Sequence, residues 1–223
     1  MTTDLLPVTD RTRIGRVRER QVRDRAELHA ILDAALVAHV ALCRDGAPAL
    51  LPMAFARDGD RLLLHGSTGA GLLRAAAAGA PVAVAVTHLD GMVYARSIFD
   101  SSMNYRSAVV LGTAKAVEGE AKVTALRALT ERLMPGRWDE VRPATRAELA
   151  ATLVLEVPLA EASVKVRAGG VSEDGPEDPA VWAGVVPLAV TASAPLPDRA
   201  LDPQVPVPAS VRAFVARHRA RTR

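Results

Sequence analysis

The protein has 223 residues and a mass of 23.5 kDa, which is enough for one sizeable hydrophobic core. Hydrophobic residues make up 49% of the chain and charged residues 24%, which excludes a wholly disordered protein. Aromatic residues make up only 3%, which disfavours binding of single-stranded nucleic acid by base stacking. One cysteine excludes an internal disulfide, and every apolar run is too short to cross a bilayer. We therefore expect a cytoplasmic protein that does not enter the membrane.

The net formal charge of +3 is distributed unevenly along the chain. Residues 1–25 hold seven arginines and four acidic residues, and residues 212–223 hold five arginines and no acidic residue. The segment between them has 16 basic and 21 acidic residues. Basic ends can bind nucleic acid or acidic surfaces. Solvated or disordered ends are the more common explanation, so we do not expect nucleic acid as a partner.

A helix followed by an antiparallel meander is predicted for the first part of the chain. Asp24 and Glu27 form a capping box ahead of apolar residues that share one helical face. Strands are expected at residues 39–43, 49–56 and 61–65, and two Asp-Gly turns separate them.

Helices and further strands alternate in the remainder. The expected helices cover residues 72–78, 122–133, about 145–151 and 210–219; Thr145 and Glu148 form a second capping box. The expected strands cover residues 82–86, 92–98, 107–117 (as one or two strands), 153–157 and 162–166. Residues 172–179 form an acidic loop, and a proline-rich extended stretch ends at Pro208. Six or more strands with few helices between them predict a mainly β (α+β) protein built on a small antiparallel barrel.

A glycine-rich loop at residues 66–71 is the sharpest local motif. It joins a strand to a helix, and free backbone amides, hydroxyl groups and the nearby Arg74 suit a phosphate. Gly66 and Gly71 match the first half of a Walker A motif, but Leu72 and Leu73 stand where Lys and Ser/Thr are required. A nucleotide-hydrolysing P-loop is therefore excluded, whereas phosphate binding and a simple strand-to-helix turn remain equal alternatives.

A second polar cluster lies at residues 95–107, where two arginines, four serines, an asparagine and a tyrosine stand between apolar strands. Such a cluster is either part of a ligand pocket or a hydrated loop. The five histidines show no metal-ligand spacing, and neither zinc-protease nor serine-hydrolase motifs occur, so no metal site is expected. Cys43 falls within a predicted strand and is interpreted as a small core residue.

Six blocks of sequence occur together in an order and at a spacing that point to one family. They are His65-Gly66-Ser67, Val86-Thr87-His88-Leu89-Asp90-Gly91, Ala95-Arg96-Ser97, Ser102-Met103-Asn104-Tyr105-Arg106-Ser107, Pro135-Gly136-Arg137-Trp138 and Trp182-Ala183-Gly184-Val185-Val186-Pro187-Leu188. Over about residues 10–190 the chain resembles the flavin-nucleotide-binding branch of the pyridoxamine 5′-phosphate oxidase-like proteins, which includes nitroimidazole-resistance reductases. The resemblance implies an antiparallel split β-barrel with a few flanking helices, and a homodimer with FMN at its interface.

The resemblance also assigns cofactor contacts to this chain. Residues of the glycine-rich loop would lie against the FMN phosphate and ribityl chain: His65, Gly66, Ser67, Gly71 and Leu72. Residues of the neighbouring strands would complete the pocket: Thr87, Asn104, Tyr105, Arg106 and Ser107. Trp182 would close the pocket, in one arrangement from the partner chain. Many relatives have Ser-Arg where this chain has Ala70-Gly71, which leaves open whether Arg74 supplies the missing guanidinium. Arg106 is expected to meet either the flavin or a carboxylate such as Asp100.

The resemblance favours an FMN-dependent reductase that acts on a small organic substrate, with no catalytic residue identified. The competing class is a non-catalytic carrier or regulator that binds flavin or haem, and His65 or His88 would then be the axial ligand of a haem. Residues 1–190 are predicted to form the FMN-binding domain, and residues 191–223 a proline-rich basic extension.

Overall fold

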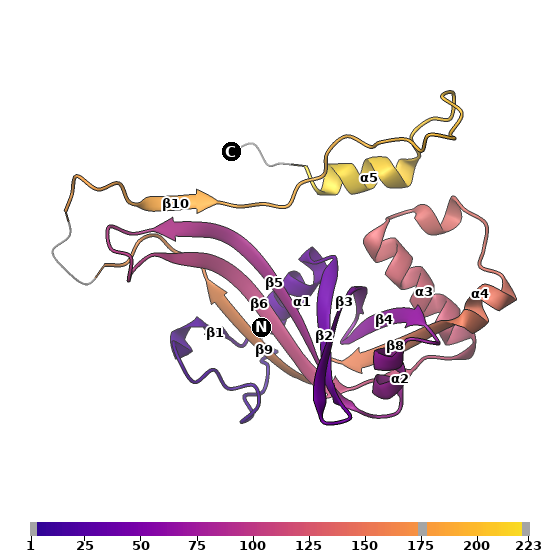
Figure 1. Cartoon of the computed structure of the whole chain (residues 1–223), viewed down its shortest axis with the longest axis horizontal. Helices are drawn as coiled ribbons and strands as arrows, with labels where there is room; N and C mark the ends of the chain where they lie inside the picture. The colour runs from indigo at the N-terminus through magenta and orange to yellow at the C-terminus, as the bar shows by residue number, and fades with distance from the viewer. Residues whose placement is uncertain (1–3, 174–177, 220–223) are drawn as a thin grey trace.

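The computed structural model describes residues 4–173 and 178–219. Within these residues ten strands form one antiparallel sheet in the order β1-β9-β6-β5-β2-β3-β4-β8-β7, with β10 paired to β5 (Figure 1). The strands are β1 (Gln21–Val22), β2 (Val37–Arg44), β3 (Ala47–Asp58), β4 (Arg61–Ser67), β5 (Pro81–Tyr94), β6 (Ser102–Thr113), β7 (Lys115–Ala116), β8 (Thr152–Pro158), β9 (Glu161–Arg167) and β10 (Gly184–Pro187). The sheet curls into a split barrel without closing, as the resemblance implies.

Helices flank the barrel rather than alternate with its strands (Figure 1). The α-helices are α1 (Arg25–Ala34), α2 (Gly71–Ala77), α3 (Gly119–Leu133), α4 (Arg146–Ala151) and α5 (Ala209–Arg217), and short 3₁₀ turns are η1 (Arg18–Arg20) and η2 (Arg137–Asp139). The described helices include none that is long and apolar enough to span a bilayer. The mainly β fold class predicted from the sequence is confirmed.

The predicted meander and its turns are confirmed. Asp45 and Gly46 both have positive φ, 53° and 77°, which is the backbone required by a two-residue hairpin turn between β2 and β3. Gly59, with φ 57°, turns β3 into β4. Thr145 and Glu148 form a complete capping box on α4. At α1, Asp24 instead caps the amide of Ala26.

The largest departure from prediction lies in β5 and β6. Two separate strands are expected at residues 82–86 and 92–98, but β5 is one strand of 14 residues that ends at Tyr94. Its pairing with β6 continues through a register shift between Leu89 and Gly91, so a bulge absorbs the turn-like sequence. Residues 102–106, part of the polar cluster expected between two strands, belong to β6. The two strands form a long hairpin that projects from the barrel.

Two clusters of buried side chains hold the structure together. The larger fills the barrel beneath α1 and α2, and the smaller packs α3 against the outer face of β3, β4 and β8. Alternation along β4 separates them, because Leu62 and Leu64 point into the barrel whereas Leu63 points toward α3. The same alternation on β2 places Cys43 on the exposed outer side, so its interpretation as a core residue is wrong.

The first and last segments that the structure describes are both attached to this body. Leu6 and Thr12 are buried, and Thr9 Oγ1 donates to Glu161 Oε1 across 2.8 Å, so residues 4–22 are not a disordered tail. After β10 the chain runs to α5, whose first turn is fixed by a hydrogen bond from the Ser210 amide to Glu140 Oε1, 3.0 Å long. A cavity of about 950 Å³ lies between this C-terminal segment and the end of α3. It shares no lining residue with the cofactor contacts predicted from the sequence.

Candidate functional site

The loop between β4 and α2 is shaped by close packing. A Cβ added at Gly66 would lie 2.5 Å from Cδ1 of the buried Leu73, so a glycine lets α2 seat against the barrel. The Ser67 carbonyl accepts from the amide of Ala70, and Ser67 Oγ accepts from the amide of Gly69 over 3.1 Å. The loop therefore keeps one compact conformation that leads into the helix.

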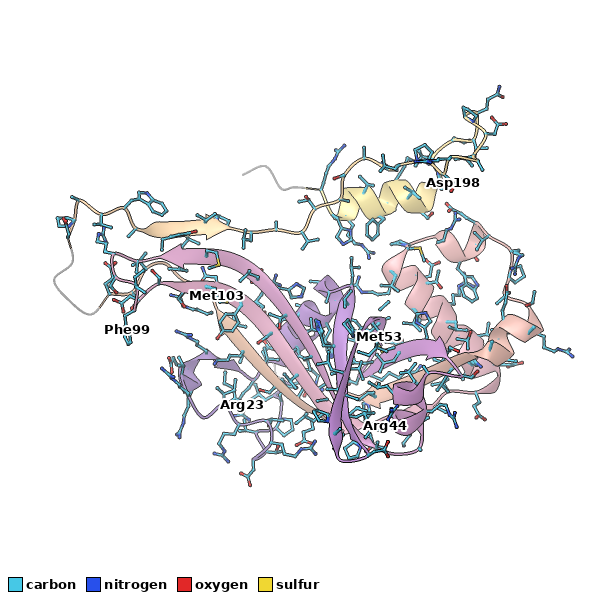
Figure 2. The ribbon with its side chains drawn as sticks, viewed as in Figure 1. Arg23, Arg44, Met53, Phe99, Met103 and Asp198 are labelled. Atoms are coloured by element: carbon cyan, nitrogen blue, oxygen red, sulfur yellow. The ribbon has the colours of Figure 1, made fainter. Side chains whose placement is uncertain are left out.

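Arg44, at the end of β2, supplies a guanidinium to this loop. A Cβ added at Gly71 would lie 2.6 Å from Arg44 Nη1, so the arginine occupies the space that a side chain at position 71 would need. Figure 2 shows Arg44 at the β2–β3 end of the barrel beside α2. The sequence pointed only to Arg74 as the guanidinium for a phosphate at this loop, and Arg74 is exposed on α2. Nothing local in the sequence links residue 44 to this loop.

His65 stands at the head of the loop with an unused ring nitrogen. Its Nδ1 is buried and has no hydrogen-bond partner among the described residues. Burial lowers the pKa of the His65 imidazole, because desolvation disfavours the charged ring. A neutral ring beside the loop can exchange one hydrogen bond with a ligand.

The strand register places several predicted residues on one face of the sheet. Thr87 is opposite Ser107, and Leu89 is opposite Tyr105. By alternation, Thr87 shares the outer face with Ala85, and Ala85 is opposite His39 of β2. The outer face thus carries three of the predicted contacts: Thr87, Tyr105 and Ser107.

Over β2, β3 and β5 this outer face carries exposed apolar side chains. Val37 of β2 is 49% exposed, Leu50 of β3 is 62% exposed and Leu89 of β5 is 45% exposed. His39, which sequence reasoning did not select, is exposed among them and is paired with Pro52 across the ladder. The alternation of buried and exposed residues along β2 was the signal that could have identified it.

Arg106 and Asn104 are already engaged within the chain. Arg106 forms two parallel hydrogen bonds to Asp90, Nε to Oδ2 at 2.9 Å and Nη2 to Oδ1 at 2.8 Å. These bonds are the main reason that the pKa of Arg106 is raised. Asp100, the carboxylate suggested from the sequence, instead accepts from Ser97 Oγ. Asn104 Nδ2 donates to the Gly169 carbonyl at 2.9 Å.

Trp182 lies at the other end of the molecule from the β4–α2 loop. Its indole is 66% exposed and packs against Tyr94 at the end of β5, with 6.0 Å between ring centroids. Figure 1 shows β10, which follows Trp182, beside the tip of the β5–β6 hairpin and far from α2. One chain therefore does not bring Trp182 to the loop.

Comparison with known proteins identifies the family. The family model described as pyridoxamine 5′-phosphate oxidase matches residues 24–166, more than half of the chain. The chain belongs to this family. The resemblance drawn from the sequence blocks is thus confirmed for the pyridoxamine 5′-phosphate oxidase family.

Two similar solved structures cover nearly the whole chain. An FAD and haem binding protein from Mycobacterium smegmatis is 45% identical, with a TM-score of 0.84 over 88% of this chain and 97% of that chain. A flavocytochrome from Azotobacter vinelandii is 36% identical, with a TM-score of 0.86 over 92% of this chain and 97% of that chain.

A third structure shares the fold alone. This putative 5-nitroimidazole antibiotic resistance protein from Bacteroides thetaiotaomicron is 21% identical, with a TM-score of 0.56 over 66% of this chain and 86% of that chain. No curated protein matches the chain.

Proposed function

We propose that the protein binds a flavin nucleotide on the outer face of its barrel and uses it in oxidation–reduction of a small organic molecule. The observation that carries the proposal is the β4–α2 loop. There Arg44 fills the space beside Gly71, and His65 Nδ1 has no hydrogen-bond partner among the described residues. The proteins that are 45% and 36% identical are named as a flavin binder and a flavocytochrome, which supports the same class of ligand.

The residues present fit the parts of a flavin nucleotide. The Arg44 guanidinium and the Ser67 hydroxyl would hold a phosphate, because both offer hydrogen-bond donors beside the loop. Thr87, Tyr105 and Ser107 would orient the isoalloxazine from β5 and β6. When bound, a flavin supplies hydride or single-electron transfer, and the protein excludes water and fixes the orientation. Arg106 would act by holding Asp90 in place.

The sequence favoured FMN, and the related proteins extend the choice to FAD. The two cofactors differ by an adenylate, which adds a second phosphate and a base. Heat release of the ligand from purified protein, followed by mass measurement, distinguishes them. A colourless protein that fails to take up either flavin would overturn the proposal.

A second copy of the chain would complete the site. The apolar outer face is too exposed for an isolated chain, and a twofold dimer could bring Trp182 of one copy toward the loop of the other. We therefore propose a homodimer. Light scattering of flavin-loaded protein tests it, and a monomer that retains flavin would exclude a shared site.

Arg44→Gln is the sharpest test of the loop. We expect flavin affinity to fall about tenfold, on the scale of one charge-assisted hydrogen bond. Arg74→Gln is the matched control, because it removes the same charge from the exposed side of α2. Equal losses of flavin affinity in both variants, or a larger loss in Arg74→Gln, would exclude Arg44 as the specific contact of the phosphate.

Haem is a second candidate ligand, favoured by the names of both close relatives. His39 is a suitable axial ligand because its ring is exposed on an apolar face. The sequence suggested His65 or His88 instead; His88 Nε2 lies 2.9 Å from the Ile31 carbonyl. A Soret band that is lost in His39→Ala, and kept in His88→Ala, would identify the ligand.

A further inference from the structure

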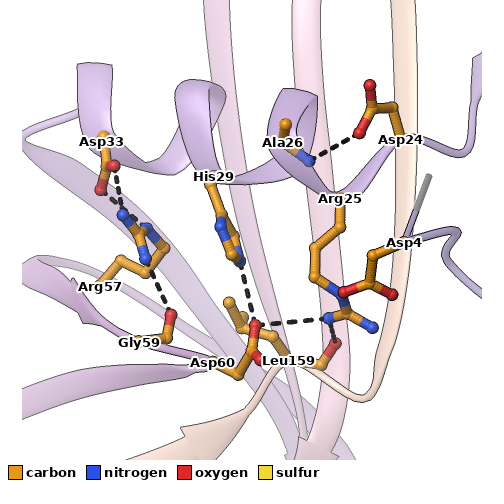
Figure 3. Close-up of polar contacts among 10 residues, drawn as sticks. All are labelled: Asp4, Asp24, Arg25, Ala26, His29, Asp33, Arg57, Gly59, Asp60 and Leu159. Atoms are coloured by element: carbon orange, nitrogen blue, oxygen red, sulfur yellow. Dashed lines mark hydrogen bonds and ion pairs between the residues drawn. The ribbon is translucent and has the colours of Figure 1, made fainter. Parts of the chain in front are cut away.

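Three arginines lie where α1, β3, α3 and α5 come together, and two of them approach the carboxylate of Asp33. Arg57 of β3 binds Asp33 of α1 through Nε–Oδ1 at 2.9 Å and Nη2–Oδ2 at 2.5 Å (Figure 3). Nε of Arg132 on α3 lies 4.0 Å from the same Oδ1. Nη1 of Arg217 on α5 donates to the Arg132 carbonyl across 3.0 Å. We call this group the arginine junction.

The junction carries more positive charge than its own groups neutralise. Its three guanidiniums are offset by one carboxylate and by the C-terminal ends of α1, α3 and α5, since Arg217 is the last residue of α5. Each helix end contributes about half a negative charge. Roughly half a positive charge is therefore left. Among the described residues, Asp33 is the only carboxylate within ion-pair distance of Arg132, and none lies within that distance of Arg217.

Arg132 is the member of the junction whose guanidinium is buried and incompletely hydrogen-bonded. Its side chain is 20% exposed, and its Nε is buried without a hydrogen-bond partner among the described residues. Burial is the main cause that lowers the pKa of Arg132; Asp33 opposes this shift, and Arg217 and Arg57 lower the pKa by smaller amounts. Buried donors are almost always paired, so an unpaired guanidinium nitrogen indicates that an acceptor belongs there.

We propose that the arginine junction binds an oxyanion, the phosphate or carboxylate group of a small molecule, between Arg132 and Arg217. The planar guanidinium suits both groups, because its paired N–H donors match their oxygens. Asp33 occupies the donors of Arg57 and competes with the anion for the remaining ones. The junction draws on none of the residues of the β4–α2 loop, and the proposal stands whether or not that loop binds a flavin.

Anion-dependent stability of the full-length protein tests the proposal. Melting temperature is measured against inorganic phosphate and, separately, malonate, with chloride at matched ionic strength as the reference. We expect a saturable rise, because an anion that binds only the folded protein stabilises it. The anion whose effect on the melting temperature saturates at the lower concentration identifies the preferred group, phosphate or carboxylate. The absence of a saturable rise with both anions would overturn the proposal.

Variants locate the effect. Arg132→Gln and Arg217→Gln should weaken anion affinity at least fivefold, whereas Arg127→Gln and Arg212→Gln remove a charge from the same two helices and should leave it unchanged. Arg217 is exposed, so its variant tests the site even if Arg132→Gln does not fold. Equal losses of anion affinity in the test and control variants would mean that the anion acts by general charge screening, which would contradict a specific site.

Two further variants separate the junction from the alternatives. Asp33→Asn should tighten anion binding although it weakens the protein, because the competing carboxylate is gone; weaker binding would contradict the proposal. The titration is repeated in Arg44→Gln. A phosphate effect that disappears there belongs to the β4–α2 loop, whereas one that persists supports the junction.

Discussion

The β4–α2 loop and the β5–β6 hairpin both carry residues assigned to the cofactor, but they differ in how far one chain alone fixes their geometry. In the loop, glycines at positions 66 and 71 admit Leu73 and Arg44, and the geometry is complete within one chain. On the hairpin, Arg106 and Asn104 are bound to neighbours and Leu89 is exposed, as is Trp182, which packs beside the hairpin against Tyr94. In the proposed homodimer, the loop would be organised before assembly, whereas the hairpin side would depend on assembly.

Placing a charge on the outer face should have the largest effect. We expect Leu50→Asp to convert the protein to a monomer and to reduce its flavin content more than tenfold, since burying an unpaired carboxylate costs several kcal/mol. Light scattering and flavin absorbance report the two results. Leu196→Asp is the control, because Leu196 is 93% exposed on the C-terminal segment. A dimeric, yellow Leu50→Asp protein would show that this face is not the interface.

Arg106→Ala should affect folding more than ligand binding. Loss of its two bonds leaves Asp90 unpaired, so we expect the free energy of unfolding to fall by about 1–2 kcal/mol, within the range for hydrogen bonds to charged groups. Flavin affinity should change less than threefold. Denaturation of the apoprotein and fluorescence titration measure the two quantities. If affinity falls more than tenfold at constant stability, Arg106 touches the flavin directly.

Gly71→Ala tests the loop with a single methyl group. The added carbon would displace the Arg44 guanidinium, which is flexible enough to move, so we expect about fivefold weaker flavin binding and little change in stability. At Gly69 an added Cβ would lie 3.5 Å from Ser67 Oγ, an ordinary contact, and Gly69→Ala is the matched control. Equal affinities for the two variants would mean that Arg44 does not contact the ligand.

His65 should make a small contribution to the pH dependence of stability. Its pKa is lowered in the folded state, so the unfolded chain binds more protons just below the ordinary histidine pKa of 6.5. Stability should therefore fall as the pH drops below 6.5, and level off below the folded-state pKa. His65→Gln should flatten this part of the profile, whereas His39→Gln should not. Parallel profiles for His65→Gln and wild type would contradict this explanation.

Local sequence patterns predicted much of the fold because its meander depends on short-range signals. The Asp-Gly turns and the Thr145 cap required only neighbouring residues. The continuity of β5 could not be predicted in this way, because the turn-like residues 87–91 stay extended only through pairing with β6. β10 likewise exists as a strand because β5 offers it a partner.

The candidate site was predictable in its motifs and not in its tertiary contacts. Gly71 was recognised, but the arginine that fills the space beside it comes from another strand. The partner of Arg106 was sought in Asp100, whereas the β5–β6 register brings Asp90 to it. Alternation on β2 already indicated that Cys43 and His39 point outward, since Ala38, Val40 and Leu42 are the buried set.

The pairing of β10 with β5 also bears on edge-to-edge polymerisation of the sheet. β5 pairs with β2 at Val82–Ala85, and beyond that ladder the same edge would be open were it not for β10 at Gly91–Tyr94. A Cβ at Gly91 would lie 2.9 Å from the Val186 carbonyl oxygen, so only glycine allows this close pairing. Open edges recruit strands from other molecules. A chain cut before residue 184, or one with a bulky residue at position 91, would consequently tend to polymerise edge to edge.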